Sequence, residues 1–222
     1  PQNPGGRVWE RDELTALGEL CRARGVLVVA DEIHADLVYP PAKHTPYASL
    51  SQDFAENSVT CTGVSKTFNL PGLQVSNIMI PNPRLRKRFQ AKLRSCGLGM
   101  PNGVGIAATE AAYRDGAPWL DALLPYLKGN LDFLCRYVSE QIPEIKVMPS
   151  EGTYLAWLDC RDVPLPANEI HAFILNEAKV GLEDGSVFGG PEPGFERINF
   201  ACPRSILEAA LGRIETAVRT LR

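Results

Sequence analysis

The 222-residue sequence has few histidines, which are common ligands of metal ions. It contains only three histidines, His34, His44 and His171, and no two of them have the spacing of ligands to one ion. It also lacks a Cys-x-x-Cys pair, the commonest sequence signature of a zinc site. We therefore do not expect a metal-dependent enzyme.

The cysteines are not clustered. All six stand far apart and mostly among apolar neighbours, unlike the closely spaced cysteines of a disulfide-rich secreted protein. We expect reduced, buried thiols in a cytoplasmic protein. The six are Cys21, Cys61, Cys96, Cys135, Cys160 and Cys202.

Long apolar runs and a strong charge imbalance are also missing. The longest apolar runs, such as residues 26–30, have the length of a strand and not the roughly 20 residues that span a bilayer. The net charge is −3, and Lys and Arg are scattered apart from a short basic run. We expect a soluble protein with no nucleic-acid or membrane partner. The basic run consists of Arg84, Arg86, Lys87 and Arg88.

The first half of the sequence alternates helical and buried-strand patterns. A helical pattern begins at Arg11 and stops at Gly25. The continuous apolar run at residues 26–30 is typical of a parallel strand that is covered on both faces, and it ends at Asp31. This alternation predicts an α/β fold with a mostly parallel sheet flanked by helices. Further strands are expected at residues 59–62 and 75–80.

The second half is predicted to form a smaller α+β domain. Pro125 and Gly129 should bend or break a long helix at residues 118–141, and we place the domain division there, between 1–120 and 121–222. A segment rich in Gly and Pro at residues 185–194 is expected to be a surface loop. Other helices are expected at 84–96, 103–113, 167–180 and 206–221, and strands at 145–148, 153–158 and 197–201.

Two polar residues follow predicted strands. Asp31 comes directly after an apolar strand, at the sheet edge where α/β folds bind ligands, although an isolated acid there is more often a helix cap. Lys66 follows another strand and precedes a turn at Gly72, where an amine could be partly desolvated and nucleophilic. A solvated surface lysine is the simpler interpretation.

Two further polar residues stand near the ends of the sequence. Asn3 lies in a turn, where asparagine usually bonds only its own backbone. Arg197 begins a mostly apolar strand and therefore needs an anion, either a structural carboxylate or the carboxylate of a substrate. Together with an acid and a lysine, these groups could serve an amino-acid substrate and pyridoxal phosphate.

Six segments, in order along nearly the whole chain, resemble fold-type I pyridoxal-phosphate enzymes. The resemblance is to class I/II aminotransferases and most closely to their cystathionine β-lyase-like (C-S lyase) branch. Each segment alone is weak, and the set is specific. The segments are NPGGRVW (residues 3–9), DEIHAD (31–36), KHTP (43–46), SKTFN (65–69), EGTYLAW (151–157) and FERINFACP (195–203).

The resemblance implies a role for each matching residue. Lys66 would be the Schiff-base lysine and the catalytic base, and Asp31 would hold the protonated pyridine nitrogen. Arg197 would bind the substrate carboxylate. Three further cofactor contacts are implied: Asn3 on the ring oxygen, Ile33 beneath the ring and Ser65 on the phosphate.

Two positions depart from the aminotransferase pattern. His34 stands where many aminotransferases have a tyrosine, and it could be either a cofactor contact or a histidine of the core. Gln74 stands eight residues after Lys66, where aminotransferases carry an arginine for the phosphate. This difference favours the lyase branch.

The resemblance predicts β-elimination from cystathionine or a cysteine S-conjugate, giving a thiol, pyruvate and ammonia. The alternatives are an aminotransferase and a truncated, non-catalytic binding or dimerisation module. The sequence opens at Pro1 without an initiator Met or signal sequence, so we expect the C-terminal portion of a longer protein. The family implies a homodimer, a preceding half with further cofactor contacts, and an exposed apolar surface where that half is absent.

Overall fold

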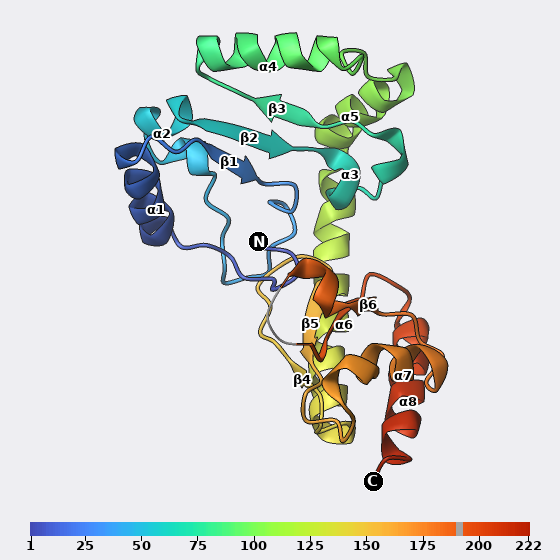
Figure 1. Cartoon of the computed structure of the whole chain (residues 1–222). Helices are drawn as coiled ribbons and strands as arrows, with labels where there is room; N and C mark the ends of the chain where they lie inside the picture. The colour runs from blue at the N-terminus through green and yellow to red at the C-terminus, as the bar shows by residue number, and fades with distance from the viewer. Residues whose placement is uncertain (190–192) are drawn as a thin grey trace. The chain divides into compact units, whose positions relative to one another are not determined.

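The computed structural model describes residues 1–189 and 193–222, and Figure 1 labels their helices and strands. These residues form two compact units. Unit 1 comprises Pro1 and Val8–Ala122, and unit 2 comprises Gln2–Arg7 and Leu123–Arg222. The predicted domain division at residue 120 stays a prediction. Part of the loop predicted at 185–194 lies outside the described residues.

Unit 1 is built on a three-stranded sheet of order β1-β2-β3. β1 (Val28–Asp31) runs parallel to β2 (Ser58–Thr62) in a register that pairs Asp31 with Cys61. β3 (Asn77–Met79) runs antiparallel to β2 in a register that pairs Cys61 with Ile78. The predicted α/β class is confirmed, and β3 departs from the parallel pattern.

The Phe54 ring packs against helix α1 (Arg11–Ala23) and against Tyr47 in unit 1. Helix α1 forms where the helical pattern predicted it, and it begins with a capping box between Glu10 and Glu13. A Cβ atom on Gly18 of α1 would lie 2.7 Å from the Phe54 ring, so only glycine allows this close approach. The Tyr47 ring stacks on Phe54 with centroids 5.6 Å apart.

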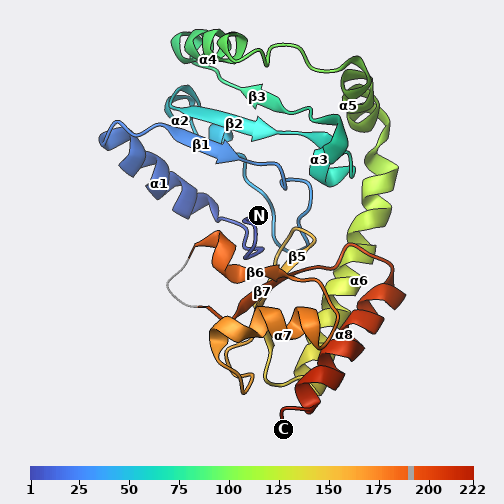
Figure 2. The same cartoon turned by 45° about the vertical axis from the view of Figure 1, so that its right-hand side comes forward.

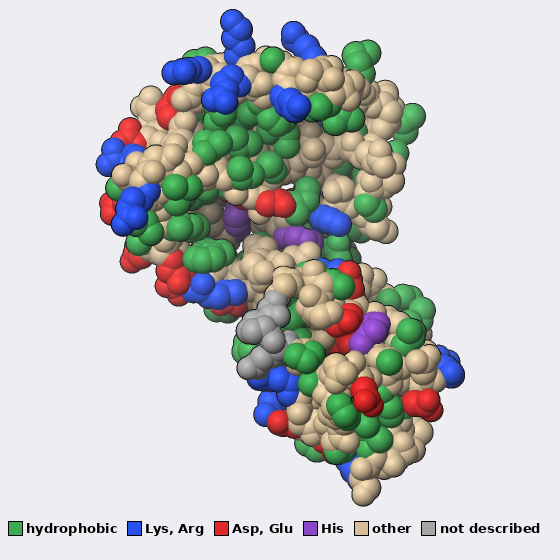
Figure 3. Space-filling model, viewed as in Figure 1, with side chains coloured by type: hydrophobic (Ala, Val, Ile, Leu, Met, Phe, Trp, Pro, Cys, Tyr) green, Lys and Arg blue, Asp and Glu red, His purple; other side chains and the backbone are tan. Residues whose placement is uncertain are grey.

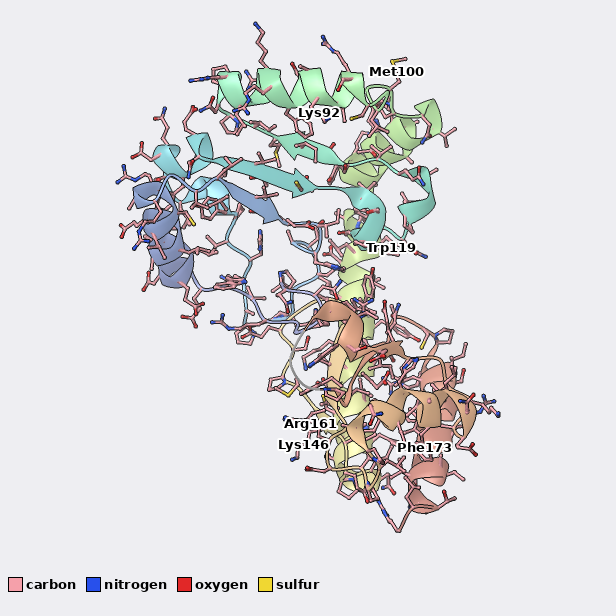
Figure 4. All side chains as sticks on the ribbon, in the orientation of Figure 1. Lys92, Met100, Trp119, Lys146, Arg161 and Phe173 are labelled. Carbon is pink, nitrogen blue, oxygen red and sulfur yellow. The ribbon has the colours of Figure 1, made fainter. Side chains whose placement is uncertain are left out.

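Several short elements of unit 1 were not predicted, because four or five residues are too few to show a period. They are η1 (Tyr47–Ser49), α2 (Gln52–Glu56), α3 (Val64–Thr67) and η2 (Pro71–Leu73). The longer helices α4 (Pro83–Ser95) and α5 (Gly103–Asp115) agree with the sequence patterns. Figure 3 shows basic side chains gathered over α4, and Figure 4 labels one of them, Lys92.

Helix α6 (Ala117–Gln141) is continuous through Pro125 and Gly129, so the expected break is wrong, and the expected bend stays a prediction. Proline removes one backbone hydrogen bond, but the residues on either side of it are held by side-chain packing. The Trp119 ring lies 5.6 Å from the Phe68 ring in unit 1. In unit 2, Leu127 and Leu131 of the same helix are almost fully buried.

Unit 2 contains a four-stranded antiparallel sheet of order β4-β5-β7-β6. Its strands are β4 (Lys146–Val147), β5 (Leu155–Asp159), β6 (Glu183–Asp184) and β7 (Phe195–Asn199). The two-residue β6 was not predicted, and the expected loop after residue 184 begins with the turn η4 (Gly185–Phe188).

The core of unit 2 lies between its sheet and the helices α6, α7 (Ile170–Asn176) and α8 (Arg204–Arg219), which surround it in Figure 2. The turn η3 (Ala167–Glu169) precedes α7, and the helix ends before the predicted residue 180. The buried apolar residues alternate on the strands and recur at helical spacing on the helices. They include Leu134, Val138, Ala156, Leu158, Ile170, Ile174, Ile198, Leu207, Leu211, Ile214 and Val218.

The cysteines are less buried than expected. All six are free thiols, but only Cys160 is buried, and Cys96 and Cys135 are exposed on helices. Residues that are adjacent in the sequence of a helix point in different directions, so apolar neighbours do not show that a cysteine is buried. Within the described residues, no helix combines the length and apolarity needed to cross a membrane, and no three His, Cys, Asp or Glu side chains are grouped as metal ligands.

One acid is buried in the core of unit 2. Glu196 of β7 is 1% exposed, and both of its carboxylate oxygens lie 3.1 Å from Nδ1 of His171. Burial raises the pKa of Glu196, while the hydrogen bond to His171 acts in the opposite direction. Glu144 is the opposite case, because its ion pair with Arg222 lowers its pKa.

We predict opposite pH dependences for Glu196→Gln and Glu144→Gln. A carboxyl with a raised pKa in the folded state binds more protons when folded, so its contribution to stability falls as the pH rises above about 4.5, the ordinary value for Glu. As the pH rises above about 4.5, Glu196→Gln should therefore gain stability relative to the wild type. The lowered pKa of Glu144 places its transition below that pH, so Glu144→Gln should lose stability relative to the wild type as the pH rises towards about 4.5. Urea unfolding of the chain at several pH values measures both differences. Parallel trends for the two variants would contradict this prediction.

Candidate active site

Asp31 and Lys66 follow the two parallel strands of unit 1. Asp31 is the last residue of β1, and Lys66 lies in α3, which follows the end of β2. Because parallel strands end at the same edge of a sheet, both residues belong to the carboxyl edge where α/β folds bind ligands. The local fold therefore gives this acid and this lysine a common position.

Two contacts join the segments that carry these residues. The backbone N–H of Glu32 donates to the carbonyl of Cys61 at 2.9 Å, which extends the pairing beyond β1. The side chain of Ile33 packs against Gly63, where a Cβ atom would lie 3.2 Å from Ile33 Cδ1. Ile33, predicted to support a cofactor ring, thus lies beside the segment that leads into α3.

The three acids of the DEIHAD segment have different partners. The Glu32 carboxylate accepts from the Tyr47 backbone N–H at 2.9 Å and lies 3.1 Å from His44 Nε2. The Asp36 carboxylate accepts from the Thr67 hydroxyl at 2.9 Å. Among the described residues, Asp31 accepts only a local bond, from the Ile33 N–H at 3.2 Å. Glu32 and Asp36 therefore bind other loops, whereas the Asp31 carboxylate does not.

Lys66 is half-buried, and within residues 1–189 and 193–222 its side chain makes no hydrogen bond or ion pair. The Lys66 amine therefore has no carboxylate partner in this part of the chain. Asp31 also acts on Cys61, its partner across the two strands. Burial raises the pKa of the Cys61 thiol most, and the negative charge of Asp31 raises it further.

The C-terminal end of the helix that carries Lys66 is held by two contacts. Thr67, fully buried, binds Asp36. Phe68 lies against Trp119, labelled in Figure 4, and against Gly116, where any side chain would collide with the Phe68 ring. Thr67 is a supporting residue that the sequence did not reveal, since its partner lies 31 residues away.

The remaining predicted residues of unit 1 lie around this helix. Ser65 is half-buried within α3. His34 is 5% exposed, so it belongs to the packed interior of the unit, and a cofactor contact from it stays a prediction. Gln74 is exposed at the end of η2, and the neighbouring carbonyl of Leu73 accepts from the Asn102 side chain at 2.6 Å.

In unit 2, the structure joins Asn3 to Arg197. The Arg197 Nη1 donates to the Asn3 side-chain oxygen at 2.6 Å, and Nη2 forms an ion pair with Glu183. The guanidinium carbon lies 4.5 Å from the centroid of the Phe188 ring. Burial raises the pKa of Tyr154, and the nearby Arg197 opposes this shift. Arg197 therefore has the anion that its position required, supplied by the chain itself.

Four residues other than glycine have left-handed backbone conformations in the described part of the chain. Asn69, Gln74, Thr153 and Lys179 have φ angles of 54°, 53°, 67° and 53°. Such angles are uncommon for residues other than glycine and rare for a β-branched one such as Thr153. Asn69 and Gln74 follow Lys66 in the sequence, and Thr153 precedes Tyr154. Strained backbone of this kind tends to occur at functional sites.

The fold and these residues define the class of protein. Residues 1–214 match the model of the aminotransferase class I and II family, and the chain belongs to this family. The resemblance predicted from the sequence is confirmed.

Individual relatives refine this assignment. The chain is 45% identical over 218 residues to cystathionine beta-lyase PatB of Bacillus subtilis, which covers 98% of the chain and 56% of PatB. It is 31% identical over 219 residues to the aspartate aminotransferase of Geobacillus stearothermophilus, covering 96% of the chain and 54% of that protein. The crystal structure of cystalysin from Treponema denticola, which contains pyridoxal 5'-phosphate, aligns with a TM-score of 0.96 and 36% identity, over 100% of the chain and 56% of cystalysin. The chain thus spans a little over half the length of these relatives.

We predict that Thr67→Val destabilises unit 1. Valine has the same shape but cannot donate to Asp36, so the loss should be about 1 to 2 kcal/mol in the free energy of unfolding. Thr109→Val is the matched control, because the Thr109 hydroxyl bonds only the Gly105 carbonyl of its own helix. The control should change stability by less than about 0.5 kcal/mol. Urea unfolding measures the change in the free energy of unfolding for both variants. Equal changes would show that the hydrogen bond between Thr67 and Asp36 stabilises the chain no more than the local bond of Thr109.

Proposed function

We propose that this chain is part of a pyridoxal-phosphate-dependent carbon-sulfur β-lyase. The proposed reaction releases a thiol from cystathionine or a cysteine S-conjugate and yields pyruvate and ammonia. The observation that carries the proposal is the common position of Asp31 and Lys66 at the carboxyl ends of two adjacent parallel strands. A homodimer and a cytoplasmic location stay predictions.

The residues of unit 1 fit this cofactor chemically. An aldehyde requires an amine without a competing carboxylate, and Lys66 has none in the described residues. A pyridine nitrogen requires an anion to keep its proton, and Asp31 is the acid of its segment whose carboxylate is not bound to another loop. Ile33 offers an apolar surface beside the same segment.

Pyridoxal phosphate, when bound, supplies the electron sink that makes the Cα proton of an amino acid removable. Lys66 would take that proton on its amine and later deliver it to a product. The negative charge of Asp31 would hold the proton on the ring nitrogen, which keeps the electron sink effective. Elimination follows when the bond between Cβ and sulfur breaks and the thiolate departs.

The proposal gives Asn3 and Arg197 binding roles. The Asn3 oxygen already accepts from Arg197, so its amide N–H group is the end that would donate to the ring oxygen. Arg197 would bind the α-carboxylate of the substrate through its guanidinium. Ser65 would contact the phosphate. These roles follow from the family motifs in which the residues stand.

Two observations favour a lyase over an aminotransferase. The chain is 45% identical to a protein named as a cystathionine beta-lyase and 31% identical to one named as an aspartate aminotransferase. In addition, Gln74 stands where the aminotransferase pattern has an arginine. Aminotransferase activity is the second candidate, because it uses the same lysine for the same first proton transfer.

We predict that Lys66→Ala abolishes the visible absorption band of the bound cofactor in the full-length protein. Lys66→Arg should also abolish it, because a guanidinium keeps the charge but is not a nucleophile at neutral pH. Lys92→Ala, on the exposed helix α4, should retain the band. Spectra of the purified variants with added pyridoxal phosphate test this. A band that persists in Lys66→Ala would rule out Lys66 as the attachment site, and a wild type without a band would favour a non-catalytic module.

A product assay separates the two enzymatic candidates. We expect full-length protein incubated with cystathionine to release pyruvate and free thiol without an added keto acid. Elimination needs no amino-group acceptor, whereas transamination does. Product formation only after a keto acid is added would contradict the lyase proposal and identify an aminotransferase.

A further inference from the structure

The Arg197 guanidinium is enclosed by groups of unit 2. Its side chain is 14% exposed, with Asn3 on Nη1, Glu183 on Nη2 and the Phe188 ring 4.5 Å from its central carbon. The Phe188 ring is itself held edge-on by Trp157, with centroids 5.6 Å apart. Arg197 therefore has little freedom to move, and a ligand must meet it where it lies.

The partner carboxylate is placed by the sheet and remains partly in solvent. The register of β6 and β7 sets Glu183 directly opposite Arg197. The Glu183 side chain is 51% exposed, in contrast to the buried arginine. An exposed glutamate can rotate into water at small cost, because water solvates the released carboxylate. Of the two residues in this ion pair, Glu183 is therefore the one that can move away into solvent.

The hydrogen bonds of Arg197 show which of its N–H donors Glu183 occupies. A guanidinium has five N–H donors and binds a carboxylate best through two parallel bonds. Asn3 and Glu183 use both Nη atoms, while Nε is buried without a hydrogen-bond partner in the described part of the chain. An incoming carboxylate that forms a two-point contact with Nε and Nη2 would therefore meet the Glu183 carboxylate at Nη2 and compete with it.

We propose that Glu183 is an internal counter-ion that occupies the carboxylate position on Arg197 until an amino-acid substrate displaces it. This inference rests on the proposed function, in which Arg197 binds the α-carboxylate. The exchange replaces one carboxylate by another, so the buried guanidinium is compensated before and after binding. Displacing Glu183 costs free energy whenever a carboxylate ligand binds Arg197. Glu183 therefore lowers the affinity for such ligands, including the substrate.

A purely structural cross-strand ion pair gives a different expectation. In that case removing the charge of Glu183 would lower stability and leave ligand affinity unchanged, or weaken it if Glu183 orients Arg197. The displacement proposal expects the reverse for affinity, because Glu183→Gln removes a competitor. The sign of the change in affinity therefore distinguishes the two.

The test compares two amines that bind the cofactor-loaded, full-length protein. L-alanine carries an α-carboxylate and no leaving group on Cβ, and ethylamine lacks the carboxylate. Binding is followed by the change in the cofactor's visible absorption. Glu183→Gln and Glu183→Ala should bind L-alanine about twofold to fivefold more tightly than the wild type, the range of partly exposed ion pairs. Their affinity for ethylamine should be unchanged.

A matched control removes a different ion pair of unit 2. Glu144→Gln breaks the pair with Arg222 and should leave the affinity for both amines unchanged. Unchanged or weaker L-alanine binding in both Glu183 variants would overturn the proposal. Equal tightening for ethylamine would also overturn it, because the effect would not depend on the carboxylate. A wild-type protein that responds to neither amine would overturn the proposed function, and this inference with it.

Discussion

The parallel pairing of β1 with β2 is the constraint on which the candidate site depends. It sets Asp31 opposite Cys61, and the chain leaves both strands at the same edge. A parallel pair requires a long connection, which here contains the loop after β1, η1 and α2. That connection supplies Tyr47 and His44, which hold Glu32, so the link that permits parallel pairing also fixes the segment after the strand.

The acids at and after the end of β1 differ in their partners. Glu32 and Asp36 are both engaged by groups from distant segments, His44 and Thr67 among them. A carboxylate near a sheet edge would otherwise be free to adopt several positions. The strand pairing of Asp31 with Cys61 holds one side of it and the bonded Glu32 and Asp36 follow it, while no cation of unit 1 within the described residues forms an ion pair with its carboxylate. The DEIHAD segment thus has one carboxylate without a cationic partner in that part of the chain.

The sequence predicted those parts of the fold that have a local pattern. The apolar run before Asp31 and the periodic helices α1, α4 and α5 were visible because their signal repeats over several turns or alternates over a strand. The two-residue β6 has no such signal, and neither does the bond between Arg197 and Asn3, which are 194 residues apart. The continuity of α6 through Pro125 depended on packing on both sides, which composition alone does not encode.

The need to compensate the positive charge of Arg197 explains its ion pair with Glu183. A guanidinium that is mostly removed from water is unstable without an anion, and the strand register supplies one at Glu183. A site that kept this arginine unpaired would have to tolerate a buried charge whenever no ligand was present. A site with a fully buried glutamate would instead hold the pair so firmly that no ligand could enter. The half-exposed Glu183 lies between these limits, because it stabilises the empty site and can still move into water.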